Sequence, residues 1–312
     1  MHLDAPVTLA GLLVGFLVGL TGMGGGALMT PILVLFFGID PLAAVSSDLV
    51  ASFFMKPVGG GVHYRRGTVN LPMVRWLAIG SVPAAFAGVV LLNALGAGEV
   101  QGRLKTMLGV VLLIAASAMV AQRAIQRRRT PLGGIPEEST VTVRPAATVA
   151  VGAVGGLIVG MTSVGSGSLI IVMLMLMYPT ISTAELVGTN LVQAIPLVGS
   201  AALGHVFFGD LRLGLPGSLL IGCLPGVYLG ARVSSRAPDN VIRPVLVVVL
   251  TASALKLLGV GNLEVGVLIG VAAMAGVTAV LRHYVRSRSS TSTLLITSPT
   301  VVASATSMPE TT

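Results

Sequence analysis

Charged side chains are scarce in this sequence, since only 10% of its 312 residues are aspartate, glutamate, lysine or arginine. A soluble protein of this length carries about a quarter charged residues. Hydrophobic residues instead make up 54% of the chain, and the mean hydropathy is +0.95. Several apolar stretches reach the roughly 20 residues that a membrane-spanning helix needs. The composition therefore excludes an ordinary soluble domain and predicts an all-α polytopic membrane protein.

Cysteine and aromatic residues are also rare, and each shortage removes a class of function. The one cysteine, Cys223, excludes an internal disulfide framework and a cysteine metal cluster. The net charge of +8 does not indicate a nucleic-acid partner, because no basic surface with interleaved aromatics exists. We predict no cofactor and no metal site. The first residues lack the basic region of a cleavable signal, so we expect the first apolar run to stay in the mature protein.

Glycine, by contrast, is abundant, and it interrupts two long apolar runs at matching positions. Residues 15–28 read Gly-Phe-Leu-Val-Gly-Leu-Thr-Gly-Met-Gly-Gly-Gly-Ala-Leu, and residues 156–169 repeat the pattern at an offset of 141. As one helix, the first run (7–37) would be about 46 Å long, against a hydrocarbon core of about 30 Å. Halved at the glycines, each piece would be too short to span. The pattern therefore predicts a broken or re-entrant helix at 7–37 and at 147–178.

The similarity between the two halves continues beyond the glycine motif. At an offset of 142, His63 corresponds to His205 and Gly67 to Gly209. We therefore expect two repeats, each with a broken Gly-rich helix and three spanning helices, and one extra C-terminal helix. The spanning helices are predicted at 42–62, 71–95, 104–124, 184–206, 214–233, 241–258 and 264–281. The predicted units are a first transmembrane repeat (1–124), a cytoplasmic linker (125–146), a second repeat (147–259), the extra helix (260–285) and a disordered tail (286–312).

The placement of lysine and arginine distinguishes two topologies. If both broken segments cross the bilayer once, the basic loop residues divide nine to eight between its two sides. If both segments are re-entrant, one side holds fourteen and the other only Arg103, Lys105 and Arg212. The positive-inside rule favours the second arrangement. It predicts seven crossings, inverted repeats, an N-terminus outside the cell and a C-terminus in the cytoplasm.

In an inverted repeat the two glycine motifs meet near the bilayer midplane, where transporters place their binding sites. A half-helix beginning at 24–26 or 165–167 would aim its positive dipole end and free N–H groups at that point. Such a point binds an anion without a buried arginine. The alternative is that the glycines only let helices pack closely. The hydroxyl donors available at the two breaks are Thr21, Thr162, Ser163, Ser166 and Ser168.

Two charged residues lie inside a predicted spanning helix. Asp48 is a functional candidate, because a carboxylate in a membrane helix is expensive. An ionised carboxylate would repel an anion, so we expect Asp48 to have a coupling (proton) or structural role. Lys56 lies eight residues further on, roughly 12 Å along the axis, so a direct pair with Asp48 is not expected. Lys56 either extends toward the basic loop or contacts the substrate, and both readings stay open.

Four neutral polar residues have two readings each. Asn190 and Gln193 suit an oxyanion as donors, or they form interhelical hydrogen bonds. His63 and His205 lie at matching helix ends, where a surface or capping role is expected ahead of titration near neutral pH.

Five stretches together resemble one family: 11–16 running into 22–26, Pro31, 46–49, the turn at 65–70, and the second copy at 156–169. They resemble the sulfite exporter TauE/SafE family of bacterial membrane anion transporters. The resemblance implies a multi-pass permease of the bacterial inner membrane for small sulfur-containing or organic anions, such as sulfite or sulfonates, often acting in export. The resemblance implies a site at the positions that match the family's motifs, and the chemistry of the residues adds Asn190. The candidate substrate-binding residues are therefore Thr21, Gly22, Gly24, Gly25, Gly26, Ser47, Thr162, Ser163, Gly165, Ser166, Gly167, Thr189 and Asn190.

The leading hypothesis is therefore secondary transport of a small anion by alternating access. No Walker sequence is present, so a proton or the membrane potential would supply the energy. A passive anion channel would use the same site, and the sequence leaves it open. An intramembrane hydrolase pairing Ser166 or Ser168 with His205 is disfavoured, because the histidine is expected near a helix end. The expected partners are the anion and the lipid bilayer, with no nucleic acid, and self-association stays open.

Overall fold

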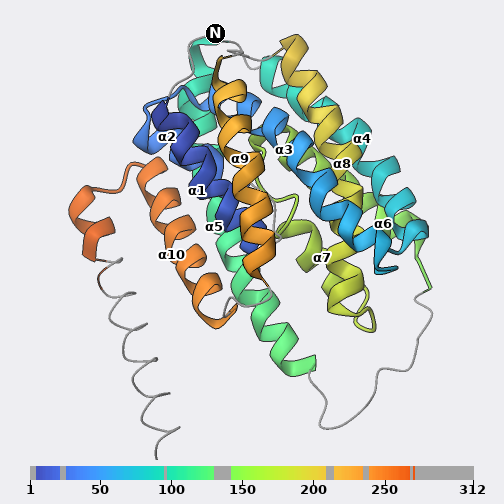
Figure 1. The fold of residues 1–312 in the computed structure, drawn as a ribbon. Helices are drawn as coiled ribbons and strands as arrows, with labels where there is room; N and C mark the ends of the chain where they lie inside the picture. The colour runs from blue at the N-terminus through green and yellow to red at the C-terminus, as the bar shows by residue number, and fades with distance from the viewer. Residues whose placement is uncertain are drawn as a thin grey trace, which may run out of the picture. The chain divides into compact units, whose positions relative to one another are not determined.

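The computed structural model describes residues 5–21, 26–94, 97–129, 142–208, 214–234, 239–267 and 270, and these residues contain helices and no strand (Figure 1). The second Gly-rich segment is broken where the sequence predicts, whereas residues 22–25 of the first lie outside the described residues. The first ends one helix at Thr21 and begins the next at Gly26, and the second is open between Thr162 and Leu169. The helices are α1 (Ala5–Thr21), α2 (Gly26–Phe36), α3 (Pro41–Arg65), α4 (Leu71–Ala94), α5 (Ala97–Arg129), α6 (Pro145–Thr162), α7 (Leu169–Met177), α8 (Thr183–Phe208), α9 (Gly214–Ser234) and α10 (Asp239–Leu257).

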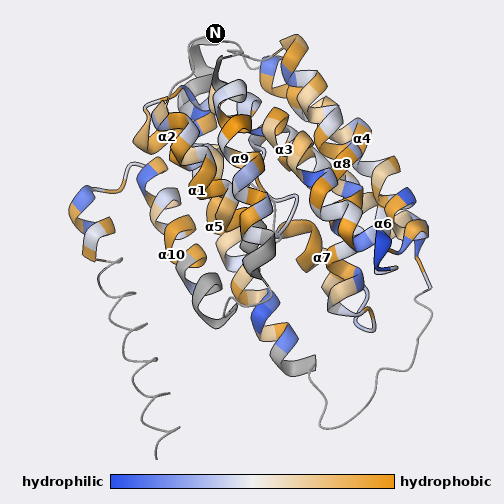
Figure 2. Ribbon diagram, viewed as in Figure 1, coloured by the Kyte–Doolittle hydropathy of each residue, from blue (hydrophilic) through white to orange (hydrophobic). Residues whose placement is uncertain are grey.

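The outward faces of the helices carry large apolar side chains. Leu13 is 60% exposed, Phe36 80% and Leu203 58%, and Figure 2 shows hydrophobic residues along the outer helices. A surface of this kind is suited to lipid rather than to water. Within the described ranges, four helices are long and apolar enough to cross a membrane: Leu71–Ala94, Gly102–Gln126, Pro145–Thr162 and Ala184–Phe208. The number of crossings and their direction stay predictions.

The α6–α7 segment folds back on itself. The hydroxyl of Tyr178, just after α7, accepts a hydrogen bond from the N–H of Arg144, just before α6, at 2.9 Å. It also lies 2.5 Å from the hydroxyl of Thr148 in the first turn of α6. The end of the segment is therefore beside its beginning. Helix α6 is long and apolar enough to cross a membrane, since its 18 residues correspond to about 27 Å, whereas α7 has only nine residues.

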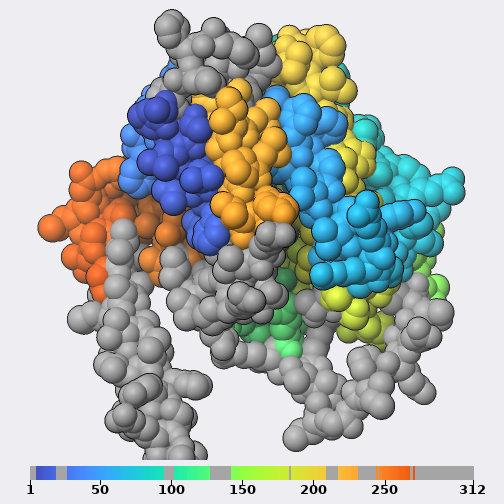
Figure 3. All heavy atoms as spheres, in the orientation of Figure 1, coloured from blue at the N-terminus to red at the C-terminus, as the bar shows by residue number. Residues whose placement is uncertain are grey.

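The helices of the two halves pair in a reciprocal way. Helix α1 packs against α9 and α6 against α4, whereas α3 packs against α8 and α5 against α10. Glycines permit the close contacts of the first two pairs: a Cβ on Gly15 would lie 2.5 Å from the carbonyl oxygen of Cys223, and one on Gly156 would lie 2.4 Å from that of Ser81. These two glycines serve helix packing, which was the alternative reading of the motif. Figure 3 shows α1 and α9 side by side on the drawn face.

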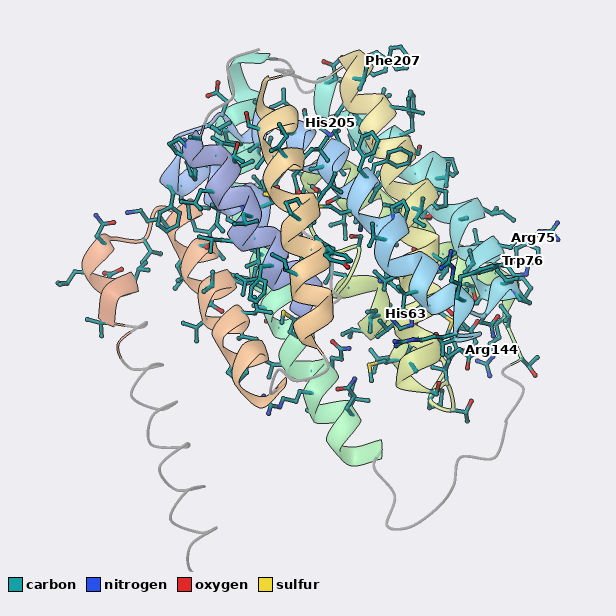
Figure 4. All side chains as sticks on the ribbon, in the orientation of Figure 1. His63, Arg75, Trp76, Arg144, His205 and Phe207 are labelled. Carbon is teal, nitrogen blue, oxygen red and sulfur yellow. The ribbon has the colours of Figure 1, made fainter. Side chains whose placement is uncertain are left out.

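Helices α3 and α8 run antiparallel through the interior. Ser46 near the start of α3 contacts His205 near the end of α8, at 2.8 Å between Oγ and Nδ1. At the other end of the pair, a Cβ on Gly188 would lie 3.1 Å from Nδ1 of His63. Figure 4 accordingly places the labelled His63 and His205 toward opposite ends of the two helices.

Three expected segments differ from the structure or lie beyond it. Helix α5 covers 97–129 rather than 104–124, and it takes in the first residues of the predicted linker. Of the extra C-terminal helix, residues 262–267 are helical. Most of the linker (130–141), the rest of that helix and the predicted tail lie outside the described residues.

Candidate anion site at the break between α6 and α7

The chain leaves α6 through a left-handed turn. Ser163 has a φ of 60°, and its N–H donates to the carbonyl of Val159 at 2.7 Å. Gly165 follows with a φ of 106°, a conformation that glycine adopts without a steric cost. The N–H groups of residues 165–168 donate to no acceptor within the described part of the chain, and the first bond back to the carbonyl of Gly165 comes from Leu169. The start of α7 therefore presents unpaired N–H groups together with the positive end of the helix dipole.

Asp48 is fully buried and joins both broken segments. Its Oδ2 accepts hydrogen bonds from Thr30 of α2 at 3.0 Å and from Ser163 at 2.7 Å. Its Oδ1 accepts a third from Ser52, one turn further along α3, at 3.3 Å. Three hydroxyl donors can satisfy an ionised carboxylate that is buried in this way. Asp48 therefore holds α2 and the end of α6 against the same point of α3.

The sequence leaves open whether Lys56 extends toward the basic loop or contacts the substrate. Its side chain does not extend to the basic loop: it is 5% exposed, and Nζ donates to Oγ of Ser166 at 2.7 Å. No carboxylate of the described residues lies within ion-pair distance of it, as expected for Asp48. Among the lysines and arginines whose side chains the structure describes, it alone is buried. The break therefore has a buried ammonium group beside its hydroxyls and unpaired N–H groups.

His205 contradicts the expectation of a surface residue at a helix end. It is 0% exposed, and its Nε2–H donates to the carbonyl of Gly160 in the last turn of α6 at 2.9 Å. Nδ1 contacts the hydroxyl of Ser46. Both ring nitrogens are thus occupied by groups other than Ser166 and Ser168, which removes the geometric basis for a serine–histidine nucleophile. His205 instead satisfies a carbonyl at the end of α6 that has no intrahelical partner.

Thr189 lies in a different network. Its hydroxyl accepts the N–H of Asn70, the residue before α4, at 2.9 Å. The side chain of Asn70 in turn donates to Glu185 at 2.9 Å and accepts the N–H of Met73 at 3.0 Å, which caps α4. These contacts fasten the start of α4 to α8, and no described contact joins Thr189 to Asp48 or Lys56.

Among the side chains that the structure describes, three buried oxygens have no hydrogen-bond partner: Oγ of Ser47, Oδ1 of Asn190 and Oε1 of Gln193. Unsatisfied buried polar atoms are rare, and a bound ligand or water commonly explains them. Gln193 is partly satisfied, because its Nε2 donates to Ser81 at 2.6 Å. Ser47 and Asn190 therefore stay candidates, as the sequence suggests.

The structure describes the first Gly-rich segment only in part. Gly22, Gly24 and Gly25 lie outside the described residues. Thr21 ends α1 and Gly26 begins α2, but their surroundings are not described. Within the described residues, no group of three or more His, Cys, Asp or Glu side chains is placed to hold a metal ion.

Comparison with known proteins identifies the family. The sequence profile of the sulfite exporter TauE/SafE family matches residues 7–257. The chain belongs to this family. It is 35% identical over 260 residues to the probable membrane transporter protein YjnA of Bacillus subtilis, covering 82% of this chain and 100% of that protein. It is 26% identical to the probable membrane transporter protein YdhB of the same organism, over 79% of this chain and 96% of that protein.

The TauE/SafE match agrees with the structural features described above. With its apolar outer helices, the chain is a multi-pass membrane protein, and its family is one of membrane transporters. A transporter moves its substrate without chemical change, which is consistent with the occupied nitrogens of His205. No solved structure matches the chain.

Proposed function

We propose that the protein is a secondary transporter of small sulfur-containing or organic anions, such as sulfite or sulfonates. The observation that supports this proposal best is the buried ammonium of Lys56, 2.7 Å from Ser166 at the start of α7. Transport follows from the family, whereas the class of substrate is inferred from this geometry and from the family's name.

The charge of Lys56 favours an anion over a neutral or cationic substrate. An ammonium group has three donors, and Ser166 accepts only one of them. A cation inside a membrane is expensive unless an opposite charge balances it. At 4 Å an anion would interact with it by about 4 kcal/mol, taking the effective dielectric constant of about 20 that reproduces measurements even for buried protein sites.

The surrounding groups favour a small oxyanion. The unpaired N–H groups of residues 165–168 point to an acceptor with several oxygens, because one oxygen cannot satisfy them all. The hydroxyls of Thr162, Ser163 and Ser166 are close by in the chain. The first break would face this point in the loaded protein, so Thr21, Gly22, Gly24, Gly25 and Gly26 stay predicted contacts, with Ser47 and Asn190. Thr189 bonds to Asn70 instead and is expected outside the site.

Inverted repeats and alternating access belong to the same proposal. The reciprocal pairing of α1 with α9 and of α6 with α4 is what two halves related by a twofold axis would produce. The return of α7 to the start of α6 supports a re-entrant segment. A re-entrant segment followed by three crossings turns the second half upside down relative to the first. Two such halves can rock against each other around a shared site, with Asp48 as the candidate coupling residue.

The charge of the anion bears on the direction of transport, and the placement of lysine and arginine bears on the orientation of the chain. A monoanion that crosses alone is driven out of a cell by about 2.3 kcal/mol for each 100 mV of membrane potential. Export is therefore the proposed direction for an unaccompanied anion. The predicted orientation keeps the N-terminus outside and the C-terminus in the cytoplasm. A passive anion channel would use the same groups and is the second candidate.

A flux screen tests the proposal. The purified chain in proteoliposomes is offered sulfite, methanesulfonate, acetate and sulfate. We expect saturable, exchange-stimulated flux of at least one of them and its loss in Lys56→Gln, whereas Lys105→Gln, an exposed lysine of α5, retains it. Single-channel currents instead of saturable exchange would identify a pore. An absence of flux for all four anions would contradict the proposed substrate class.

A further inference from the structure

Two opposite charges are buried in the described interior, and they do not form an ion pair. Asp48 and Lys56 both belong to α3, but only hydroxyl groups lie within hydrogen-bond distance of either. Both lie on α3, eight residues and therefore about 12 Å apart along the helix axis, a distance at which charges in an interior of low dielectric constant still interact. When nothing is bound, the positive charge of Lys56 offsets the negative charge of Asp48. The empty site is therefore neutral as a whole.

The other groups around Asp48 do not alter this balance. Helix α2 contributes Thr30 and the end of α6 contributes Ser163, both neutral. Helix α9 brings the buried thiol of Cys223 within electrostatic range. Helix α8 contributes His205, whose ring nitrogens are occupied elsewhere. No second carboxylate is buried among the described side chains.

We propose that one proton, carried by the carboxylate of Asp48, accompanies each monovalent anion that binds beside Lys56. This inference rests on the proposed function. A bound monoanion neutralises Lys56 and leaves Asp48 with an uncompensated negative charge in an interior of low dielectric constant. Protonation of Asp48 removes that charge. The empty and the loaded protein are then both neutral, so both can change conformation without moving net charge through the bilayer.

The hydrogen bonds of Asp48 can accommodate the proton. The carboxylate takes one proton from water on the loading side and returns it to water on the other side, with no other bond made or broken. A protonated carboxyl group must donate one hydrogen bond, and a hydroxyl can change from donor to acceptor by rotation. Thr30 and Ser163 share Oδ2, so this change occurs at the contact between α2 and the end of α6. The proton therefore acts at the point where both broken segments meet α3.

The inference also defines the class of substrate and the driving force. One ammonium group and one neutralised carboxylate balance a single negative charge, so monoanions are carried in preference to dianions such as sulfate. A proton that accompanies the anion removes the outward bias of the membrane potential. The direction then depends on the anion and proton gradients together, and export needs an outward anion gradient that exceeds the inward proton gradient.

Simultaneous measurement of anion flux, lumen pH and current tests the inference. The full chain is reconstituted, and methanesulfonate, the anion of a strong acid that does not cross a bilayer in uncharged form, is applied as an inward gradient, with the flux into protein-free liposomes subtracted. We expect one proton to enter with each anion, no net current, and an initial rate unaffected by a potential set with potassium and valinomycin. Asp48→Asn should carry the anion without the proton and generate a current, whereas Glu264→Gln, an exposed carboxylate, should behave as wild type.

The outcomes separate the two proposals. Wild-type flux accompanied by a current of one charge per anion and no change of lumen pH would overturn the coupling and leave anion transport standing. Equal flux of sulfate would overturn the preference for monoanions. No flux of any anion would remove the proposed function itself. The wild-type ratio of protons to anions decides the matter even if Asp48→Asn does not fold.

Discussion

The two halves of the chain share a backbone plan but differ in the chemistry of equivalent positions. Asp48 and Lys56 of α3 correspond to Asn190 and Val198 of α8. Ser163 and Ser166 at the second break, which bond to Asp48 and Lys56, correspond to Gly22 and Gly25 at the first. The hydroxyls that surround Asp48 on α2 and α3 have an isoleucine and an alanine as counterparts. The first half therefore supplies both buried charges, whereas the second half supplies a neutral amide at Asn190 and the hydroxyls of Ser163 and Ser166.

The difference shows how a duplicated fold acquires a single charged site. A twofold-symmetric site with two lysines and two aspartates would hold four charges in the membrane interior, each of them costly. The charges are confined to one interface, between α3 and the α6–α7 break, so in the proposed transport cycle only one ammonium group needs an anion. The buried, unpartnered Oδ1 of Asn190 marks the neutral counterpart of this interface.

Removal of the charge from the first half should have the largest effect. Lys56→Gln deletes the only buried ammonium among the described side chains, and we expect anion flux to fall by about 30- to 1,000-fold, as for loss of one partner of a buried charge pair. Lys56→Arg, which keeps the charge, should retain part of the flux. The initial rate of methanesulfonate or sulfite uptake measures both. An unchanged rate in Lys56→Gln would place the substrate elsewhere.

Replacement of a glycine by valine in either glycine-rich motif should also abolish transport, and the two variants compare the halves directly. We expect Gly25→Val and Gly167→Val each to insert into the membrane normally and to lose anion flux, because a branched side chain blocks the approach of backbone N–H groups to the anion. Flux and detergent-solubilised yield are measured in parallel. Normal flux in both variants would refute a site at the breaks. Loss in Gly167→Val alone would confine the site to the second half.

Removal of a single hydroxyl at the charged interface should have a moderate effect. Ser166→Ala leaves Lys56 without its described partner, and we expect the apparent affinity for the anion to fall about 10-fold, as for loss of one hydrogen bond to a charged group. Ser117→Ala, which removes an exposed hydroxyl that bonds only within α5, is the matched control. Equal affinities in the two variants would show that Ser166 does not contact the substrate.

The smallest effect is expected at Thr189, on the neutral side. Its hydroxyl holds the N–H of Asn70 at the start of α4, so Thr189→Val should lower stability by about 1 kcal/mol and change flux less than threefold. Thermal unfolding in detergent and anion uptake are measured together. A loss of flux as large as that of Ser166→Ala, with unchanged stability, would return Thr189 to the substrate site.

The sequence predicts the breaks well, because glycine and hydroxyl clusters inside overlong apolar runs are local signals. It also predicts a role for Asp48, since a carboxylate in a membrane helix is rare. Family membership is confirmed by the match to residues 7–257. The second break is present between Thr162 and Leu169, whereas the first falls on residues outside the described ones and the inverted orientation of the repeats stays a proposal.

The contacts that define the charged interface could not be read from the sequence. Lys56 and Ser166 are 110 residues apart, and Asp48 and Ser163 are 115 apart, so only the packing of α3 against the second break brings them together. His205 was expected at the surface because it is close to the end of its helix. It is buried because α8 continues alongside the last turn of α6, where a carbonyl needs a donor.

The central claim is that the ammonium of Lys56 and the start of α7 hold the transported anion. Its most direct test is a crystal structure with bound selenite, a heavy-atom counterpart of sulfite located by its anomalous scattering. We predict a selenite oxygen at hydrogen-bond distance, about 2.7–3.2 Å, from Nζ of Lys56, with the backbone N–H groups of residues 165–168 around it. A well-occupied selenite that contacts neither Lys56 nor this segment would contradict the account.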